Sequence, residues 1–333
     1  MSIAVEPARL HEYPAVQGWN ALHPDRVPAG LEIFTKGGEN KPAVLRLKFA
    51  DPALPAVYAK GGSSASLAVE REVHERILPA LGVPTARYLG HVASLQSDWI
   101  FLEDVGDRWL RPQIRAETRI AGNWLGRMHA AAAGHANGWR LPDAGAGRYL
   151  GQLRIARERI LTHHDNPGLD AADTEVLDAI LRQLEEVESR WEQVSLAATG
   201  IPPTLVHGDF QTKNLRLRER EGELELVPID WEMAGWGVPI VDIADAPRPA
   251  AHQQVDLRAY RAATAGRWPH LSADDLRRLA AVGHLWRRLA AIEWETTHLR
   301  FTRPRYLLKP ISTLRRYRDQ VADGLERLGP WLP

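Results

Sequence analysis

Short apolar runs alternate with turn residues over the first hundred residues. Five runs rich in aliphatic, β-branched and aromatic residues predict strands: residues 31–35, 43–49, 56–60, 86–93 and 98–105. The first three are separated by the turn segments KGGENKP and DPALP, so we expect three consecutive antiparallel strands. Between the third and fourth runs, residues 65–81 place apolar side chains at helical spacing until Gly82 and Pro84 end the pattern. Strands with one inserted helix predict a small α+β unit.

After Gly106 the pattern changes to long amphipathic segments with helical periodicity. Helices are expected at residues 116–133, 149–164, 171–194, 272–299 and in the closing segment. Short strands return only at residues 204–208, 214–218 and 224–231. A chain of 333 residues is about twice a typical domain. We therefore expect an α+β fold of two lobes, residues 1–105 with the antiparallel sheet and residues 106–333 mainly helical.

The composition is that of a folded protein in water, with 44% hydrophobic and 25% charged residues. No run approaches the roughly 18 apolar residues that a membrane helix needs, and the first residues lack a basic region followed by an apolar one. We expect a cytoplasmic protein without a membrane, nucleic-acid or obligate protein partner. The absence of cysteine excludes a disulfide framework and a thiolate zinc site.

The net charge is zero, but the charges are unevenly distributed along the chain. From Arg248 onward, fifteen arginines and Lys309 face eight acids, which gives plus eight, so the first 247 residues carry minus eight. Such an excess is typical of a solvated helical face. It does not predict a nucleic-acid surface.

Candidate chemistry begins in the segment TLVHGDFQTKN. His207, Gly208 and Asp209 follow an apolar run, and Asn214 comes five residues after the aspartate. Sixteen residues further, Asp230 ends another apolar run. Two carboxylates and an amide at strand ends are oxygen donors that a hard dication accepts. This pattern predicts magnesium and phosphate chemistry.

Phosphoryl transfer needs several parts besides the metal ligands. A loop must cover the phosphates, a lysine must contact them, an acid must hold that lysine, and a further residue must orient the attacking oxygen. The segment KGGENK is a candidate for the loop, Lys60 closes the third predicted strand, and Glu72 lies on the helix that follows.

These residues, in this order, resemble the aminoglycoside phosphotransferase and choline kinase family, the small-molecule branch of the protein-kinase-like fold. The family's glycine-rich loop is matched by Gly37, Gly38 and Asn40. Its HGDxxxxN motif is matched by residues 207–214, and its IDWE and WGxPxxD motifs by residues 229–232 and 236–242. The resemblance covers residues 30 to 245 and implies a two-lobed protein-kinase-like fold.

The resemblance implies a role for each matched residue. Asp209 would position and deprotonate the acceptor hydroxyl. Asn214 and Asp230 would hold Mg²⁺ against the nucleotide phosphates. Lys60, steadied by Glu72, would contact the α- and β-phosphates.

Two of these assignments have alternatives within the sequence. Lys48 could replace Lys60, and Glu70 could replace Glu72. We favour Lys60 because the run that it closes directly precedes the helix, which gives the strand, lysine, helix order of the fold.

The resemblance also assigns residues that would not react. His207 and Gly208 would shape the catalytic loop, and Asp242 would brace it. Glu103 and Val105, at the expected boundary between the lobes, are predicted to contact the nucleotide.

Only eight residues separate Asp230 from Pro239, which leaves no room for the activation segment of a protein kinase. We therefore expect a kinase that transfers phosphate from ATP, with GTP as an alternative donor, to a hydroxyl of a small molecule. An aminoglycoside-like or other hydroxylated antibiotic, or a related metabolite, is the expected acceptor. Choline, another amino alcohol or a sugar is the alternative, and a non-catalytic nucleotide-binding regulator is a third interpretation.

Overall fold

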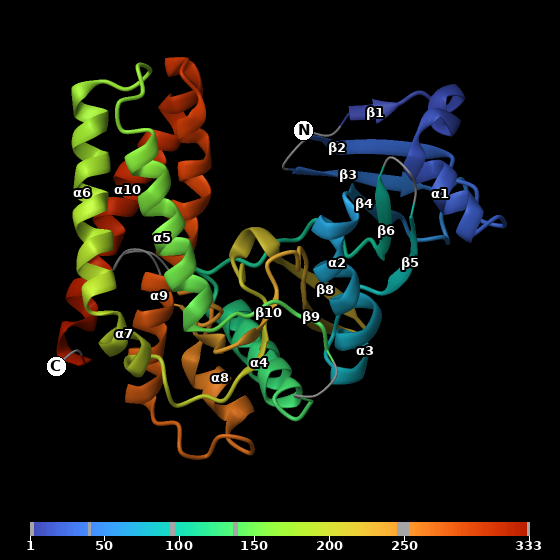
Figure 1. The fold of residues 1–333 in the computed structure, drawn as a ribbon. Coiled ribbons are helices and arrows are strands. Elements are labelled where there is room, and N and C mark those ends of the chain that lie inside the picture. The colour runs from blue at the N-terminus through green and yellow to red at the C-terminus, as the bar shows by residue number, and fades with distance from the viewer. Residues whose placement is uncertain (1–2, 39–40, 94–96, 136–138, 245–252, 332–333) are drawn as a thin grey trace. The chain divides into compact units, whose positions relative to one another are not determined.

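The computed structural model describes residues 3–38, 41–93, 97–135, 139–244 and 253–331. The chain divides into two compact units (Figure 1). The first unit contains Met1–Leu110, Asn137–Pro142 and Gln211–Ala234, and the second contains the remaining residues. The expected lobes, 1–105 and 106–333, were contiguous, whereas this division assigns two later segments to the first unit.

The first unit is built on an antiparallel six-stranded sheet, which confirms the α+β fold with an antiparallel N-terminal sheet. Its strand order is β1-β2-β3-β4-β6-β5. β1 was not predicted from the sequence. The strands are β1 (Ile3–Val5), β2 (Gly30–Gly38), β3 (Lys41–Lys48), β4 (Val57–Gly62), β5 (Tyr88–Val92) and β6 (Asp98–Glu103).

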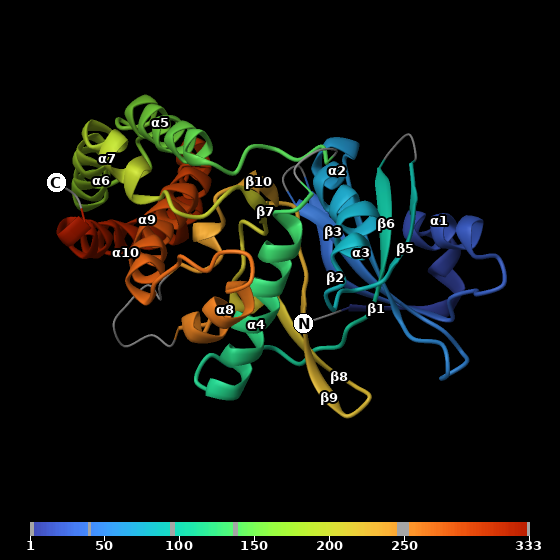
Figure 2. The same cartoon turned by 90° about the horizontal axis from the view of Figure 1, so that it is seen from below.

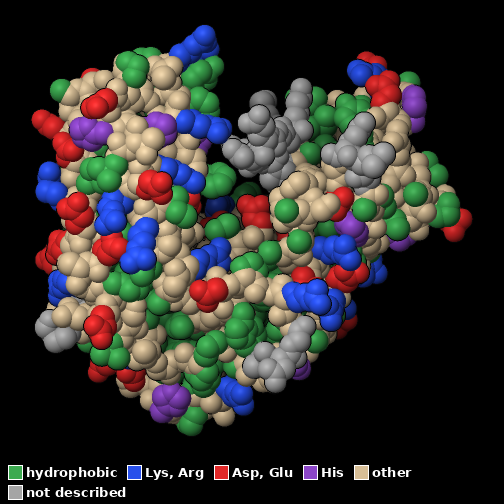
Figure 3. Space-filling model, viewed as in Figure 1, with side chains coloured by type: hydrophobic (Ala, Val, Ile, Leu, Met, Phe, Trp, Pro, Cys, Tyr) green, Lys and Arg blue, Asp and Glu red, His purple; other side chains and the backbone are tan. Residues whose placement is uncertain are grey.

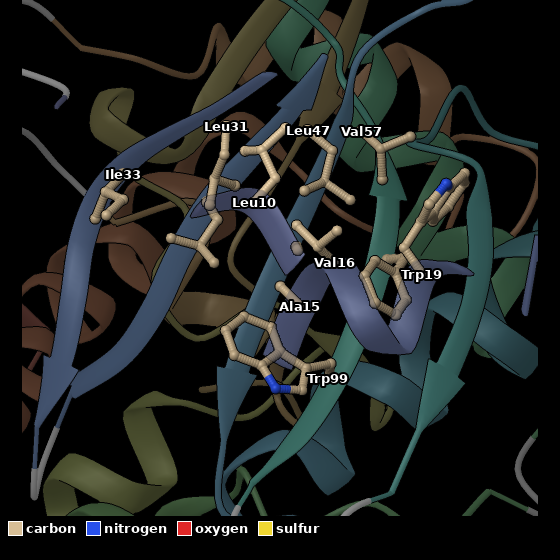
Figure 4. Packing of buried hydrophobic residues seen from close by; sticks show 12 residues of the cluster. Leu10, Ala15, Val16, Trp19, Leu31, Ile33, Leu47, Val57 and Trp99 are labelled. Atoms are coloured by element: carbon tan, nitrogen blue, oxygen red, sulfur yellow. The ribbon is translucent and has the colours of Figure 1, made fainter. Parts of the chain in front are cut away.

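One face of this sheet is covered by α1 (Pro14–Leu22), which follows the 3-10 helix η1 (Pro7–Glu12) and was also not predicted. Side chains on a strand alternate between faces, and Val57 and Ala59 of β4 belong to the core under α1. Tyr58 and Lys60 consequently point to the opposite face. Figure 4 shows this core, with Leu10, Ala15, Val16, Trp19, Leu31, Ile33, Leu47, Val57 and Trp99 labelled.

The predicted helix at 65–81 forms, but it is divided into α2 (Ser64–Glu72), a π-helical turn (Val73–Ile77) and α3 (Leu78–Leu81). Within the turn the N–H of Leu78 bonds the carbonyl of Val73, five residues back. Pro79 has no N–H for the Glu75 carbonyl and its ring crowds that position, which explains the local widening. Gly82, with φ of 61°, ends α3 in the left-handed conformation.

A separate hairpin completes the first unit. β8 (Leu215–Arg220) pairs with β9 (Glu223–Pro228), so that Leu215 lies opposite Pro228. The two-residue turn between them has positive φ at both Glu221 (54°) and Gly222 (81°), as a type I′ turn requires. The hairpin confirms the strands predicted at 214–218 and 224–231, and it delivers residues 229–232 from its second strand.

The second unit is mainly helical, as predicted. Figures 1 and 2 show α5, α6, α9 and α10 side by side. The expected helix at 171–194 is divided at Arg190, and α8 was not predicted. The elements are α4 (Arg115–Ala132), α5 (Ala146–Thr162), α6 (Ala171–Ser189), α7 (Trp191–Ala197), β7 (Thr204–Val206), β10 (Gly235–Gly237), α8 (Leu257–Thr264), α9 (Ala273–Thr296) and α10 (Pro304–Leu328).

Two surface properties follow from these elements. Within the described part of the chain, no helix is both long and apolar enough to cross a bilayer. Acidic and basic side chains are interspersed over the helices of the second unit on the face drawn in Figure 3.

Candidate active site

Lys60 lies in the middle of the sheet of the first unit, on the face opposite α1. Its strand neighbours are Val44 on β3 and Ile100 on β6, and only 9% of the residue is exposed. Its ammonium donates to the Glu70 carboxylate at 2.6 Å and to the Asp230 carboxylate at 2.5 Å. A buried ammonium is therefore held between two carboxylates that come from α2 and from the end of β9.

Electrostatics keep this ammonium charged. Burial alone would lower the pKa of Lys60, but the negative charges of Glu70, Asp230 and Glu232 outweigh burial and raise it. The third carboxylate, Glu232, lies 3.4 Å from the ammonium. Burial raises the pKa of Glu70, and the charge of Lys60 opposes that shift. The cluster is rich in oxygen donors around one cation.

The expectation that Glu72 holds Lys60 is wrong in this structure, and the alternative, Glu70, makes the contact. Residues three or four apart share a helix face, whereas residues two apart do not. Leu67 and Glu70 form the buried face of α2. Glu72 points elsewhere and pairs with Arg76, one turn further, at 3.2 Å.

Lys48, the alternative to Lys60, lies at the far end of β3, opposite Gly30. Its ammonium pairs with Glu32 at 2.5 Å, and half of its side chain is exposed. Glu32 neighbours it on β2, away from α2. The choice of Lys60 over Lys48 thus agrees with the geometry of the sheet.

Asp230 has an unusual backbone. Its φ is 67°, in the left-handed region that side chains other than those of Gly, Asn and Asp rarely adopt. Strain of this kind persists where the surroundings enforce it, often at functional sites. The preceding residue, Ile229, donates its N–H to the carbonyl of Asn214 at 2.9 Å. This bond ties the segment carrying Asp230 to the 3-10 turn Thr212–Asn214.

The donors at this position fit a hard dication. Asp230 and Asn214 both line the same cavity, and Asn214 is 5% exposed. Carboxylate and amide oxygens are the ligands that Mg²⁺ accepts, with the remaining positions left to water and phosphate. Within the described residues no group of three or more His, Cys, Asp or Glu side chains is arranged to hold a metal ion.

The cavity next to Lys60 has a volume of about 460 Å³. Its apolar wall includes Ala86, Val105 and Ile229, which pack with the buried Val227. The backbone N–H of Val105 donates to no acceptor among the described residues. A flat apolar group that accepts a hydrogen bond would fit this wall.

Glu103 also lines the cavity, but its side chain is engaged by protein groups. It accepts hydrogen bonds from the Arg87 N–H and from the Arg218 guanidinium, both at 3.1 Å. The carboxylate of Glu103 therefore fixes the end of β6, next to Gly106 with its φ of 81°.

Aromatic and charged side chains at the rim of the cavity were not predicted from the sequence. Phe34 and Tyr58 stack with ring centroids 5.6 Å apart, and Arg46 lies over both rings. Trp109 lies 3.5 Å below the Arg216 guanidinium. The alternation that placed Lys60 on this face would also have placed Tyr58, two residues earlier.

The predicted phosphate loop is described only in part. Gly37 and Gly38 close β2, and Gly38 lies opposite Lys41, so the strands extend further into KGGENK than the sequence suggested. Asn40 lies outside the described residues.

In the second unit, the residues around Asp209 form a separate, braced loop. β7 ends at Val206, and Gly208 adopts a φ of 80°. The carboxylate of Asp242 accepts the N–H of His207 at 2.7 Å and that of Gly208 at 3.0 Å. These two bonds fix the backbone immediately before Asp209.

Asp242 is itself fully buried and held by His129 at 3.3 Å. The other nitrogen of His129 contacts the Tyr260 hydroxyl at 3.0 Å. Burial alone would raise the pKa of Asp242, but the hydrogen bond and charge of His129, with contributions from His207, keep it below its usual value. Asp242 therefore stays a carboxylate that accepts N–H groups.

Comparison with known proteins assigns this chain to a family. The sequence matches the phosphotransferase enzyme family over residues 31–292. The chain belongs to this family. Membership confirms the predicted resemblance and the predicted class, a phosphotransferase with an alcohol group as acceptor. No curated protein matches the sequence.

Solved structures show that the family fold extends over nearly the whole chain. A choline kinase from Cryptosporidium parvum Iowa II is 12% identical, with a TM-score of 0.59 over 97% of each chain. A spectinomycin phosphotransferase bound to ADP and spectinomycin is 9% identical, with a TM-score of 0.59 over 95% of this chain and 98% of the other. A microcompartment-associated aminopropanol kinase is 14% identical, with a TM-score of 0.55 over 87% and 91%. At these identities the likeness concerns the fold, and it confirms the two-lobed kinase-like architecture.

Proposed function

We propose that this family member is an ATP-dependent O-phosphotransferase of the cytosol that moves the γ-phosphate to a hydroxyl of a small molecule. The observation that carries the proposal is the buried Lys60 ammonium, held by Glu70 beside a cavity of about 460 Å³. An ammonium fixed in this way offers a preorganised positive charge to phosphate groups, and such preorganisation is a main source of catalysis. GTP is the alternative donor.

The cavity residues supply the nucleotide site in this proposal. The base would lie on the wall of Ala86, Val105 and Ile229, with the Val105 N–H as donor and Glu103 next to it. Lys60 would contact the α- and β-phosphates while Glu70 retains it. Gly37, Gly38 and Asn40 would cover the phosphates with backbone N–H groups.

Asn214 and Asp230 would hold Mg²⁺. When bound, the ion would supply positive charge that offsets the negative charge of the phosphate groups. The spectinomycin phosphotransferase structure contains ADP, which supports nucleotide use by this fold.

Asp209 would orient the acceptor and take the hydroxyl proton. The acceptor oxygen then forms a bond to the γ-phosphorus while the bond from that phosphorus to the ADP oxygen breaks. The products are a phosphate monoester and ADP. The bonds from Asp242 to the two preceding N–H groups keep the Asp209 backbone in place, which reduces the cost of orienting the reacting groups.

The pairing of acids and the burial of aromatic side chains in the second unit restrict the chemical class of the acceptor. A polycationic aminoglycoside would need unpaired acids, and Glu293 of the basic C-terminal segment is already paired with Arg159 at 2.5 Å. The quaternary ammonium of choline would need accessible aromatic rings, and Trp286 of α9 is fully buried and stacked on Tyr149 and Trp191. We therefore favour a hydroxylated antibiotic or related metabolite of low positive charge over these two classes, with a sugar as the alternative.

An ADP-release screen with Mg²⁺ tests the proposal. Purified protein is supplied with ATP or GTP and with aminoglycosides, other hydroxylated antibiotics, choline and sugars. We expect acceptor-dependent ADP release that Asp209→Asn removes. Release that is independent of acceptor and equal in the variant would contradict the proposal and favour a nucleotide-binding regulator.

A further inference from the structure

Two adjacent arginines, Arg287 and Arg288, are buried in the middle of α9. This part of α9 packs tightly on the 3-10 segment Pro239–Val241. A Cβ added at Gly283 would lie 2.0 Å from the Ile240 carbonyl oxygen, so the helix and this segment are in close contact. One turn later, Arg287 donates a hydrogen bond to the Val241 carbonyl.

This contact brings α9 to the catalytic loop within the second unit. Val241 directly precedes Asp242, which in turn holds the N–H groups of His207 and Gly208. Burial and the charge of Arg287 lower the pKa of Arg288, and the negative charge of Asp209 opposes that shift. Arg288 is thus a buried cation in the vicinity of the group assigned to the acceptor hydroxyl.

The contacts of Arg288 are incomplete for a buried guanidinium. Its Nη1 donates to the Gln320 side chain at 2.8 Å, and its charge lies 5.2 Å from the centroid of the Tyr317 ring. Its Nε is buried without an acceptor. Among the described residues no carboxylate oxygen lies within 4.0 Å of its nitrogens. Only 8% of the residue is exposed, so water compensates for little of the missing partner.

A buried charge without a counter-ion is costly. Burial and the neighbouring charge of Arg287 lower the pKa of Arg288 to about 10. Arg316, from α10, stands over the same Tyr317 ring at 5.4 Å. Positive charges from two helices therefore converge on this ring.

Several other arginines of these helices pair with acids. Arg278 pairs with Asp275 at 3.2 Å, and Arg315 pairs with Asp173 at 3.5 Å. A general shortage of acids around α9 and α10 therefore does not explain why Arg288 has no carboxylate partner among the described residues.

Resting on the proposed function, we propose that Arg288 binds an anionic oxygen group of the acceptor, so that the acceptor is a hydroxyl compound carrying a carboxylate or a phosphate. Arg288 has a guanidinium that can offer Nε and Nη donors to two oxygens at once. Arg316 adds a second positive charge. The acceptor would present its hydroxyl to Asp209 and its anionic group to Arg288, and the same arginines would repel a polycation.

A matched series of three-carbon alcohols tests the charge assignment. Glycerol is neutral, glycerate carries a carboxylate, glycerol 3-phosphate carries a phosphate, and 3-amino-1,2-propanediol carries an ammonium. ADP release gives kcat/KM for each. We expect about tenfold or more in favour of an anionic member over glycerol, from one charge-assisted contact, and the lowest value for the ammonium compound. The two anionic arms distinguish carboxylate from phosphate.

If the enzyme phosphorylates none of these four alcohols, the ADP-release screen with the wider set of acceptors tests the charge preference. Turnover confined to anionic compounds supports the proposal. Turnover confined to neutral or cationic compounds overturns it but leaves the phosphotransferase intact. Absence of acceptor-dependent turnover throughout overturns this proposal and the proposed function together.

Substitutions of Arg288 test whether this residue binds the anionic group of the acceptor. Arg288→Gln should raise KM for the anionic acceptor about tenfold or more, with KM for ATP unchanged. Arg288→Lys keeps the charge and should recover part of the loss, although it lacks the planar fork. Arg315→Gln, which removes the same charge from a surface pair with Asp173, is the matched control and should stay within twofold. If Arg288→Gln does not fold, Arg288→Lys carries the test, and a KM within twofold of wild type in a folded variant overturns the assignment.

Discussion

The ammonium of Lys60 donates to the buried carboxylate of Glu70 across 2.6 Å. Glu70 comes from the helix that directly follows the strand of Lys60, so the pair links two consecutive elements of the first unit. Neither charge is stable alone at this depth, because each is almost entirely removed from water. We therefore expect the two residues to act as a unit in stability and in the proposed phosphate binding.

Lys60→Ala should lower kcat/KM for ATP by about 10² or more, because it removes the positive charge that we propose contacts the phosphates. Glu70→Ala should be milder, and the double variant should be less than additive since the residues are coupled. Steady-state ADP release measures all three. Glu72→Ala and Lys48→Ala are the controls and should stay within a few-fold of wild type. A larger effect of Glu72→Ala than of Glu70→Ala would show that the observed pairing is not the functional one.

Asp209→Asn should reduce turnover by about 10² to 10⁴, the usual contribution of a general base. Nucleotide affinity should change little, because the cavity beside Lys60 does not include Asp209. Single-turnover kinetics and nucleotide titration separate the two quantities. Turnover within threefold of wild type would remove Asp209 from this role.

Asp230→Asn should greatly weaken magnesium-dependent nucleotide binding in calorimetry, because a full negative charge is replaced by a neutral amide. Asn tolerates the left-handed backbone at this position, so the variant should fold normally. Asp230→Ala should lose binding and also stability, by about 1 kcal/mol, since alanine is strained at positive φ. Magnesium-dependent binding that is unaltered in both variants would exclude Asp230 as a ligand.

Asp242→Asn should destabilise the protein by about 3 kcal/mol near neutral pH, because it breaks a buried, charged network. One side-chain oxygen would become an NH₂ group facing a backbone N–H donor. The folded pKa of Asp242 is depressed, so its contribution to stability is present above the unfolded value of about 4 and is lost as the pH falls below it. Denaturant unfolding at pH 7 and pH 3 should show a difference between wild type and variant that shrinks at the lower pH. An equal difference at both would show that Asp242 is not stabilised as a carboxylate.

The strands that flank Lys60 could be predicted because their apolar runs are bounded by turn residues. α1 was missed because it is only nine residues long and contains Gly18 among its interior positions, which weakens any local signal. Its helical state is stabilised by tertiary packing of Trp19 against the sheet, a contact that no sequence window contains. The division of the helix at 65–81 could have been suspected from Pro79.

Within the candidate site, residues fixed by a strand were easier to place than those on helices. Strand alternation and order favoured Lys60, whereas the choice between Glu70 and Glu72 depended on the rotation of α2 about its axis. That rotation is set by which side chains the sheet buries, and Leu67 gives the only local clue. Arg288 was not singled out because a buried, unmatched arginine looks the same in sequence as a solvated one.

The polypeptide passes between the two units five times, at 110/111, 136/137, 142/143, 210/211 and 234/235. A chimera of two relatives that is joined at a single position would therefore combine segments from different parents within at least one unit. Acceptor specificity cannot be exchanged in this way without dividing that unit. A fusion at residue 105 would place a foreign Asp230 and hairpin against the native Lys60 and Glu70, although these groups depend on one another for charge balance. Recombination that respects the units must transplant residues 111–136, 143–210 and 235–333 together, and it must leave 211–234 with the sheet of the first unit.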